Sequence, residues 1–306
     1  MKHVSIVIVN WNGKKDTIAC LSSIKAMKKS GVVLDTIVVD NGSTNNSLEA
    51  IKTAHPWVHV VELKENLGFT GGNNIGIKKA LSDNADLVWL LNNDTIVDAN
   101  ALALVEVFDD KTVGVAGSKI YFQKGHEYHK DRYTKDQQGK VLWYAGGLVD
   151  WANMYASHNG VDEVDYGQYE KLAETPFVTG CSFMVSREVI EHVGVLDEKY
   201  YLYLEDLDYC MRIERAGYRL LYVPTSIVWH VNAGSSGGAG NTLHEYYMTR
   251  NRLLVGLRYA PLRTKVALVR EAFGFLYSGT KIKRQAVIDA CLGKWGKQYD
   301  PKNTSH

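Results

Sequence analysis

The sequence predicts an α/β protein with a mainly parallel central sheet covered by helices on both faces, followed by a C-terminal helical extension. Three observations carry this prediction. Short apolar runs alternate with helical patterns over residues 1–120, as expected for strands joined by crossover helices. Polar Asn and Asp side chains gather where the apolar runs end. From residue 244 onward the pattern is helical and basic.

The expected elements follow from the period of the apolar residues, which is short for strands and near 3.6 for helices. In the first half, strands are expected at residues 4–9, 34–39, 58–63, 86–91 and 113–120, and helices at 17–29, 47–54, 74–81 and 99–108. Residues 121–175 lose the alternation and are interpreted as strands and loops inserted into the sheet domain. Beyond them we expect strands at 177–185, 219–223 and 226–229, helices at 186–192 and 205–216, and a flexible loop at 234–240.

Composition excludes several classes of protein. Of the 306 residues 45% are hydrophobic and 23% charged, which supports a full core and argues against disorder. The net charge of +1 gives no reason to expect a nucleic-acid partner. The four cysteines are widely spaced, so we expect free thiols in a reducing cytoplasm. No signal peptide or membrane-spanning stretch is found, so a soluble or peripheral protein is expected.

Polar residues follow three of the expected strands. They are Asn10 to Gly13, Asp40 to Ser43, and the triplet from Asn92 to Asp94. In open α/β sheets, ligands bind at the carboxyl ends of the strands. These side chains are therefore predicted to converge on one ligand-binding edge.

Asp94 is the candidate metal ligand because it directly follows a buried strand. Mg²⁺ and Mn²⁺ prefer oxygen ligands and leave coordination positions for phosphate. Asn92 and Asn93 are weaker ligands that can hydrogen-bond phosphate, ribose or water. Taken alone, the triplet more often forms a turn that caps a helix. His230 is of interest as a metal neighbour only if it lies near Asp94, since a lone histidine at a strand end is more often structural.

Two further segments have both a functional and a structural interpretation. Glu205 and Asp206 open a helix, where carboxylates act as caps, but adjacent carboxylates also fit a general base with a supporting partner. The segment 65–74, with Asn66 and Gly72, opens another helix. Its glycines would let a ligand approach the backbone and its amides would attract phosphate, although a capped turn fits equally well.

Together these segments resemble the family 2 glycosyltransferases, and within them the bacterial rhamnosyltransferase-like branch. The resemblance covers residues 4–252, and its pieces occur in the order of that family. The pieces are Val7 to Gly13, Val38 to Ser43, Asn66 to Asn73, Leu90 to Asp94, Val178 to Met184, Gly194 to Glu198, Tyr203 to Asp208, Arg212, Gly217 with Tyr218, His230, Gly234 to Ser236, and Arg250 with Asn251.

The resemblance implies a GT-A fold, a nucleotide-sugar donor held through Mg²⁺ or Mn²⁺, and inversion at the anomeric carbon. It implies that Asp40 lies near the nucleobase, with Asn10 in the same pocket. Asp94 matches the last acidic position of the family's DxD element, which here has amides at the two preceding positions. Asp206 matches the expected general base, and His230 matches a histidine that can approach the metal or diphosphate.

The remaining site residues support these groups. Asn66, Gly72, Asn92 and Asn93 are expected on the donor side. Glu205 is expected to orient the site or cap its helix, and Arg250 to contact the diphosphate or to pair with an acidic neighbour.

On this resemblance, residues 1–240 form the catalytic domain, with a nucleotide-binding half (1–120) and an acceptor and catalytic half (121–240), and residues 241–306 form the basic extension. The expected function is transfer of a sugar, such as rhamnose from dTDP-rhamnose, to a glycan or lipid-linked acceptor in surface polysaccharide synthesis. A sugar nucleotidyltransferase would favour a basic glycine-rich loop after the first strand, whereas residues 10–15 contain one glycine. A non-catalytic nucleotide-sugar-binding protein is supported only by the two amides.

Charge is distributed unevenly along the chain. Residues 250–302 contain twelve Lys or Arg and three Asp or Glu, so the rest of the chain is acidic. Mixed with apolar residues, this composition fits peripheral contact with the inner face of an anionic membrane. It fits equally a solvated helix face that packs on the sheet domain or on a second subunit.

Overall fold

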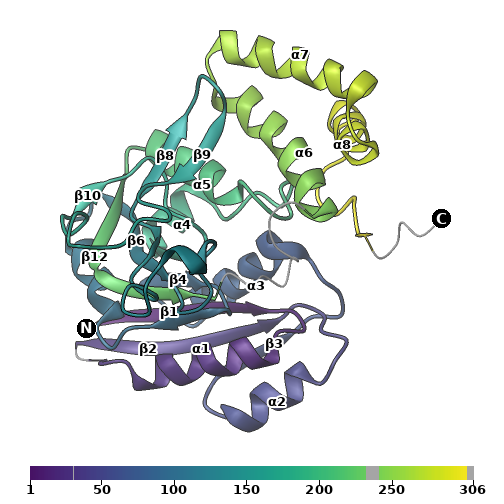
Figure 1. Cartoon of the computed structure of the whole chain (residues 1–306). Helices are drawn as coiled ribbons and strands as arrows, with labels where there is room; N and C mark the ends of the chain where they lie inside the picture. Colours follow the sequence, from purple (N-terminus) through teal and green to yellow (C-terminus); the bar gives the residue numbers. More distant parts are fainter. Residues whose placement is uncertain (30, 232–240, 302–306) are drawn as a thin grey trace.

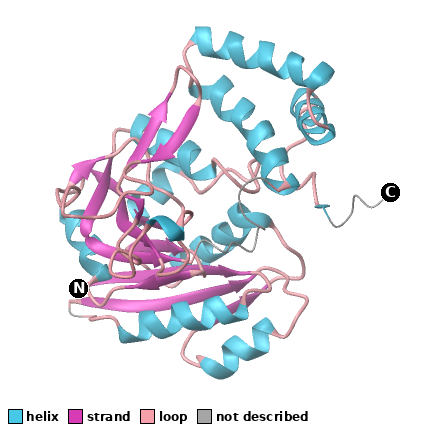
Figure 2. Ribbon diagram, in the orientation of Figure 1, coloured by secondary structure: helices cyan, strands magenta, loops and turns pink. Residues whose placement is uncertain are grey.

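The computed structural model describes residues 1–29, 31–231 and 241–301. Ten strands of these residues form one sheet, in the order β10-β12-β6-β11-β4-β1-β2-β3, with β5 and β7 added on β12 and β6. Figure 2 shows helices on both sides of the sheet and a group of helices at the C-terminal end. The predicted α/β class with a C-terminal helical extension is confirmed, and the sheet is mixed.

Among the described residues, six strands of the sheet pair in parallel with at least one neighbour. They are β1 (Lys2–Asn10), β2 (Val32–Asp40), β3 (His59–Glu62), β4 (Leu87–Leu91), β6 (Val113–Phe122) and β12 (Arg219–His230). The antiparallel strands are β5 (Thr95–Val97), β7 (Leu142–Tyr144), β10 (Ala173–Glu174) and β11 (Ser182–Ser186). Strand β11 lies between β4 and β6, so the two parallel blocks meet at an antiparallel strand. A separate hairpin consists of β8 (Gly147–Asp150) and β9 (Tyr155–His158).

The helices fall into two groups along the chain. Those of the sheet region are α1 (Lys14–Ala26), α2 (Ser47–Ala54), α3 (Gly68–Ser82), α4 (Arg187–Val193), α5 (Glu205–Arg215) and the 3₁₀ helices η1 (Ala101–Asp109) and η2 (Lys130–Arg132). The extension contains α6 (Thr242–Tyr259), α7 (Leu262–Ser278) and α8 (Lys281–Cys291). In Figure 1 these three lie to one side of the sheet, with α7 outermost.

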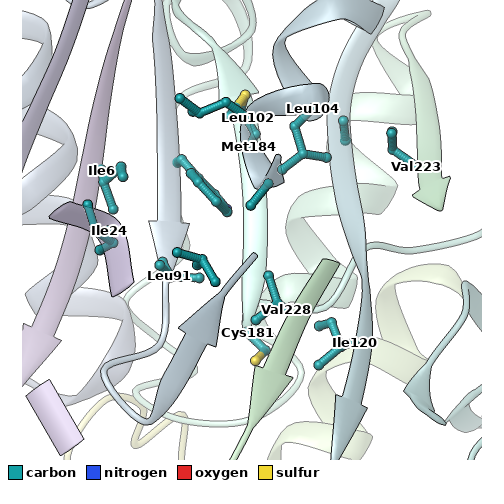
Figure 3. Close-up of a cluster of buried hydrophobic side chains, with 14 of the residues drawn as sticks. Ile6, Ile24, Leu91, Leu102, Leu104, Ile120, Cys181, Met184, Val223 and Val228 are labelled. Carbon is teal, nitrogen blue, oxygen red and sulfur yellow. The ribbon is translucent and has the colours of Figure 1, made fainter. Parts of the chain in front are cut away.

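Both faces of the sheet are buried, because neighbouring residues of a strand point to opposite faces. Ile6 and Ile8 of β1 join a core cluster with α1 and η1, part of which is shown in Figure 3. Val7 between them joins a second cluster with residues of α3, α5 and the extension. Burial on both faces explains why the parallel strands have continuous apolar runs.

Several expected boundaries moved. The strand expected at 177–185 is shorter and corresponds to β11. The two short strands expected at 219–223 and 226–229 form the single strand β12. The pairing of β12 with β6 is irregular between Val223 and Ile227, around Pro224. The helix expected at 74–81 begins earlier, at Gly68. The loop expected at 234–240, including the matched segment 234–236, lies outside the described residues.

Candidate active site

The polar ends of β1, β2 and β4 are joined by a chain of hydrogen bonds. Asn10 Nδ2 donates to Asp40 Oδ1 over 2.7 Å. Asn10 Oδ1 accepts from the hydroxyl of Thr17 over 2.9 Å, and that hydroxyl accepts from Asn93 Nδ2 over 2.9 Å. Asp40 also accepts bonds from the amide and hydroxyl of Ser43. The predicted convergence of the three strand ends is therefore present, and Asn10 lies beside Asp40.

Asp94 and His230 meet at the same edge. Strand β5, which follows Asp94 directly, pairs with β12 so that Thr95 lies opposite His230. Nε2 of His230 lies 3.1 Å from Oδ1 of Asp94, and both side chains are mostly buried. Burial alone would raise the pKa of Asp94, but the charge and hydrogen bond of His230 hold that pKa below its usual value. His230 therefore lies near Asp94, which was the condition for considering it as a metal neighbour.

The donor set of this pair fits a hard divalent cation. Mg²⁺ is commonly bound through one or two protein side chains, with phosphate and water completing the shell. Asp94 offers a carboxylate oxygen and His230 an imidazole nitrogen, and these two atoms lie close together. The other ring nitrogen of His230, Nδ1, is buried and has no hydrogen-bond partner among the described residues. No group of three or more His, Cys, Asp or Glu side chains suited to a metal occurs in residues 1–29, 31–231 and 241–301. A cation here would need ligands from the substrate.

Asp206 is held at the start of α5 by backbone amides. The N–H of Gly180 donates to its Oδ2 over 3.0 Å, and the N–H of Leu207 donates to its Oδ1 over 2.8 Å. The next carbonyl along, that of Cys181, accepts from the N–H of Asn92 over 3.0 Å. Residues 180 and 181 thus connect Asp206 to the end of β4.

Burial changes the protonation of both carboxyl groups at this helix start. It raises the pKa of Asp206, although the amides of Gly180 and Leu207 act in the opposite direction. Burial, reinforced by the charge of Asp206, raises the pKa of Glu205 well above its usual value. Oε2 of Glu205 is buried and has no hydrogen-bond partner among the described residues. Two adjacent carboxyls with separated proton affinities are typical of acid–base sites.

The loop before α5 has an unusual backbone. Tyr201, Tyr203 and Leu204 all have positive φ, at 64°, 71° and 67°. Residues other than glycine adopt this left-handed region at a cost of about 1–2 kcal/mol each. Surrounding contacts must therefore hold the loop in place, and such strain is often found at active sites.

Those contacts come mainly from α6. Nδ2 of Asn251 lies 2.8–3.0 Å from the carbonyl oxygens of Tyr200, Leu202 and Tyr203. Arg250 donates to the carbonyls of Lys199 and Tyr200, each over 3.0 Å, and to that of Gly296 over 2.7 Å. We call the two side chains Arg250 and Asn251 the carbonyl clamp.

The carbonyl clamp corrects the expectation for Arg250. Its side chain is completely buried, and its nitrogens bind backbone carbonyls and the side chain of Asn251, so the expected diphosphate contact or acidic partner is replaced by a structural role. Carbonyl oxygens satisfy a guanidinium without a countercharge, which is why the residue type alone was misleading.

Segment 66–74 binds the same loop. The amides of Phe69 and Thr70, at the start of α3, donate to the carbonyl of Tyr201 over 2.9 and 3.3 Å. These amides were the expected anion site, and in this structure a protein carbonyl occupies them. Gly72 packs against β1, where an added Cβ would come within 2.8 Å of Val9. Asn66 Oδ1 accepts from Asn41 Nδ2 and from the amide of Gly68. The structure thus favours the capped-turn interpretation of this segment.

Asp208 forms ion pairs with two arginines. It is fully buried and accepts from Arg212, Arg258, Tyr200 and Tyr259 over 2.8–3.1 Å. Arg258 and Tyr259 belong to α6. This carboxylate therefore adds a second connection between the start of α5 and the extension, beside the carbonyl clamp.

Sequence reasoning missed residues from the insertion and from α1. The ring of Trp143 lies edge-on to those of His230 and His158, with centroids 4.6 and 4.3 Å apart. Burial lowers the pKa of His158 to about 4, so this imidazole is neutral near pH 7. Thr17 links Asn10 to Asn93, although the sequence pattern predicts it only as the start of a helix. The sequence signal that could have identified Thr17 is a polar residue on the buried side of α1.

Comparisons with known proteins show the family to which the chain belongs. A family model described as "Glycosyltransferase like family 2" matches residues 2–252. A Haloferax volcanii protein named low-salt glycan biosynthesis hexosyltransferase Agl10 is 27% identical over 217 residues, covering 70% of this chain and 62% of the relative. A Mycobacterium tuberculosis N-acetylglucosaminyl-diphospho-decaprenol L-rhamnosyltransferase is 25% identical, covering 67% of this chain and 68% of the relative. The dTDP-rhamnosyl transferase RfbF of Shigella flexneri is 25% identical, covering 85% and 82%.

Two solved structures share the fold over 95% of this chain. One is the mannosyltransferase PcManGT from Pyrobaculum calidifontis, in complex with GDP-Man and Mn²⁺, at 18% identity and a TM-score of 0.57, with 74% of its chain covered. The other is GalNAc-T7 with UDP, GalNAc and Mn²⁺, at 19% identity and a TM-score of 0.67, with 55% of its chain covered.

Proposed function

The chain belongs to glycosyltransferase family 2 and has a GT-A type fold, and we propose that it transfers a sugar from a nucleotide-sugar donor to an acceptor hydroxyl with inversion at the anomeric carbon. The observation that carries the proposal is the placement of Asp206. Its carboxylate is fixed by the amide of Gly180, and the next residue binds the end of β4 that leads to Asp94. A candidate base and a candidate diphosphate site thus lie on one edge.

Each polar group then has one role. Asn10, Asp40, Asn92 and Asn93 line the donor side, where Asp40 accepts from the nucleobase or ribose. Asp94 and His230 would hold Mg²⁺ or Mn²⁺, which supplies charge neutralisation for the leaving diphosphate. Both structural neighbours were solved with Mn²⁺, which supports this assignment.

The chemical step needs a base on the acceptor side. Asp206 accepts the proton of the acceptor hydroxyl as the oxygen attacks the anomeric carbon, and the nucleoside diphosphate leaves from the opposite face. The raised pKa of Asp206 brings its proton affinity closer to neutral pH, which favours general-base catalysis. Burial raises the pKa of Glu205 well above its usual value, which disfavours a second negative charge beside the reacting hydroxyl.

The relatives' names support a donor and an acceptor. Two of them carry rhamnosyltransferase names, one naming dTDP-rhamnose chemistry and one a decaprenol-linked acceptor. We propose dTDP-rhamnose as the donor and a lipid-linked or glycan hydroxyl in surface polysaccharide synthesis as the acceptor. The enzyme would then work on the cytoplasmic side, at the inner face of the cell membrane.

The deciding experiment is a thermal-shift screen of nucleotide-sugars with and without Mn²⁺, followed by a transfer assay with the best donor. A ligand that binds the native state raises the melting temperature. We expect a dTDP-sugar to raise it, more strongly with Mn²⁺, and nucleoside diphosphate to be released with the acceptor. Binding without any transfer or donor hydrolysis would favour a non-catalytic binding protein. Pyrophosphate release from a nucleoside triphosphate and a sugar phosphate would favour a nucleotidyltransferase.

A further inference from the structure

Helix α7 exposes a continuous apolar stripe. Its members recur every three or four residues and therefore lie on one face of the helix. They are Leu262, Val266, Val269, Phe273 and Tyr277, whose exposed fractions are 77%, 62%, 41%, 59% and 87%. We call this set the α7 stripe. Five large apolar side chains in one row form an unusual surface for a monomer in water.

The stripe is not the face that α7 uses to pack on the protein. The buried residues of the helix are Thr264, Leu268 and Ala272. At 100° per residue, the centre of that buried face lies about 140° around the helix axis from the centre of the stripe. In Figure 1, α7 is the outermost helix of the C-terminal group and lies away from the sheet. No described element covers the stripe, since all five residues are exposed.

Positive charges border the stripe on both sides. Arg263 and Arg270 follow one edge and Lys265 the other, by the same helical geometry. The single acidic residue of α7, Glu271, lies on the opposite side of the helix and pairs with Arg252. An apolar stripe between basic edges matches the interface of an anionic bilayer, where hydrocarbon lies beneath negative headgroups.

The neighbouring helix α8 also exposes basic and apolar side chains. Lys281, Arg284, Ile288 and Leu292 of α8 and its end are exposed. Residues 262–300 contain eight Lys or Arg and three Asp or Glu, a net charge of +5. A second copy of the chain is a poorer occupant, because pairing two stripes would bring the basic edges of both copies together.

We propose that the α7 stripe, with its basic edges, docks the enzyme on an anionic lipid surface, the helix lying in the plane of the headgroups. No described helix is long and apolar enough to cross a bilayer, so the contact is peripheral. This inference deepens the proposed function, on which it rests for the location of a lipid-linked acceptor. Docking confines the enzyme to the surface on which such an acceptor is anchored.

The test is co-sedimentation of the full chain with vesicles of phosphatidylcholine alone or mixed with phosphatidylglycerol. We expect binding to the anionic vesicles that weakens at least tenfold in 0.5 M salt, on the order expected for screened charges. The double variant Val266→Asp/Phe273→Asp should bind at least about tenfold more weakly, because each carboxylate would enter the apolar interface. Arg263→Glu/Arg270→Glu should lose the preference for phosphatidylglycerol.

The matched control is Val33→Asp/Leu172→Asp, two apolar-to-acidic changes at exposed positions on β2 and beside β10, far from α7. This control should bind vesicles as the parent does. Unchanged binding by the stripe variant, or no binding by the parent, overturns the proposal. So does a parent dimer in light scattering that the stripe variant dissociates without any change in vesicle binding.

Failure of docking can be separated from failure of the proposed function. The stripe variant should transfer sugar to a water-soluble acceptor at the parental rate, since α7 contributes no residue to the site. If the parent transferred sugar to none of the acceptors tested, the proposed glycosyltransferase function would be contradicted. Vesicle binding would still test whether the α7 stripe docks on lipid.

Discussion

The backbone amide of Gly180 and the carboxylate of Asp206 lie 3.0 Å apart, joining the segment before β11 to the first turn of α5. This hydrogen bond fixes one carboxylate oxygen and acts to lower the pKa of Asp206, but burial outweighs it and raises that pKa. Asp206 is the proposed general base, so the first prediction concerns its substitution.

Asp206→Asn should reduce sugar transfer by about 10²–10⁴-fold, the usual contribution of a general base. Donor affinity should stay within about twofold, because Asp206 acts on the acceptor. Transfer is measured by release of nucleoside diphosphate and binding by calorimetry. Asp136→Asn, at an exposed position, is the matched control and should behave as the parent. Full turnover by Asp206→Asn would remove this residue as the base.

The pH dependence of transfer should reflect the raised pKa of Asp206. A base must be deprotonated to act, so activity falls as pH drops through its pKa. We expect the acid limb of kcat/KM above the ordinary aspartate range, which is near pH 4. Rate measurements between pH 4 and 8 in a constant buffer series test this. An acid limb at or below about pH 4 would contradict it.

Asp94→Ala should remove most of the effect of Mn²⁺ on donor binding. Losing the carboxylate leaves His230 as the one assigned protein ligand, so calorimetry with Mn²⁺ should show donor affinity falling toward its metal-free value. Asp98→Ala, on the same segment and half-exposed, serves as the control. Unchanged Mn²⁺-dependent affinity in Asp94→Ala would show that the cation is bound elsewhere.

Glu205→Gln should alter the pH dependence of stability. The raised pKa means that folded Glu205 keeps a proton that the unfolded chain releases above about pH 4.3. The parent therefore loses free energy of unfolding as pH rises from there toward the folded-state pKa, by at most about 1.4 kcal/mol per pH unit. The glutamine variant lacks this loss.

Urea unfolding at several values between pH 5 and 8 measures the difference. The variant should gain on the parent with each step upward in pH, whereas Glu49→Gln, on the exposed side of α2, should follow the parent. A constant difference between variant and parent across this range would show that Glu205 ionises normally.

Asn251→Asp tests the carbonyl clamp with little change in shape. The substitution replaces the amide donors that hold the carbonyls of Tyr200, Leu202 and Tyr203. We expect a loss of about 1–3 kcal/mol in the free energy of unfolding, typical of buried groups left without partners. Well below the melting temperature, kcat should fall while the KM for the donor stays similar, because the loop positions the base. A stability loss with unchanged kcat would make the clamp purely structural.

The sequence predicted the strand-end edge well, because buried strands and the polar residues that end them are adjacent along the chain. Asn10, Asp40 and Asn93 could be placed together by this local rule. The partners of Arg250 and of the α3 amides could not be predicted, because they lie about 50 and 130 residues away along the chain. They are also backbone carbonyls, which every residue carries, so residue type does not reveal them. Likewise, nothing in residues 121–175 indicated that Trp143 would lie against His230.

The carbonyl clamp has a practical consequence for redesign of the chain. A shortened version ending near residue 240 would keep the sheet and every strand-end side chain, yet it would release the loop that carries the proposed base. Shortening to residue 278 would remove Gly296, whose amide binds the carbonyl of Lys199 and whose carbonyl binds Arg250. Truncation therefore cannot separate docking from chemistry. Chimaeras that exchange acceptor preference should carry α6, α8 and the segment to residue 300 together with residues 196–208 as one transferable unit.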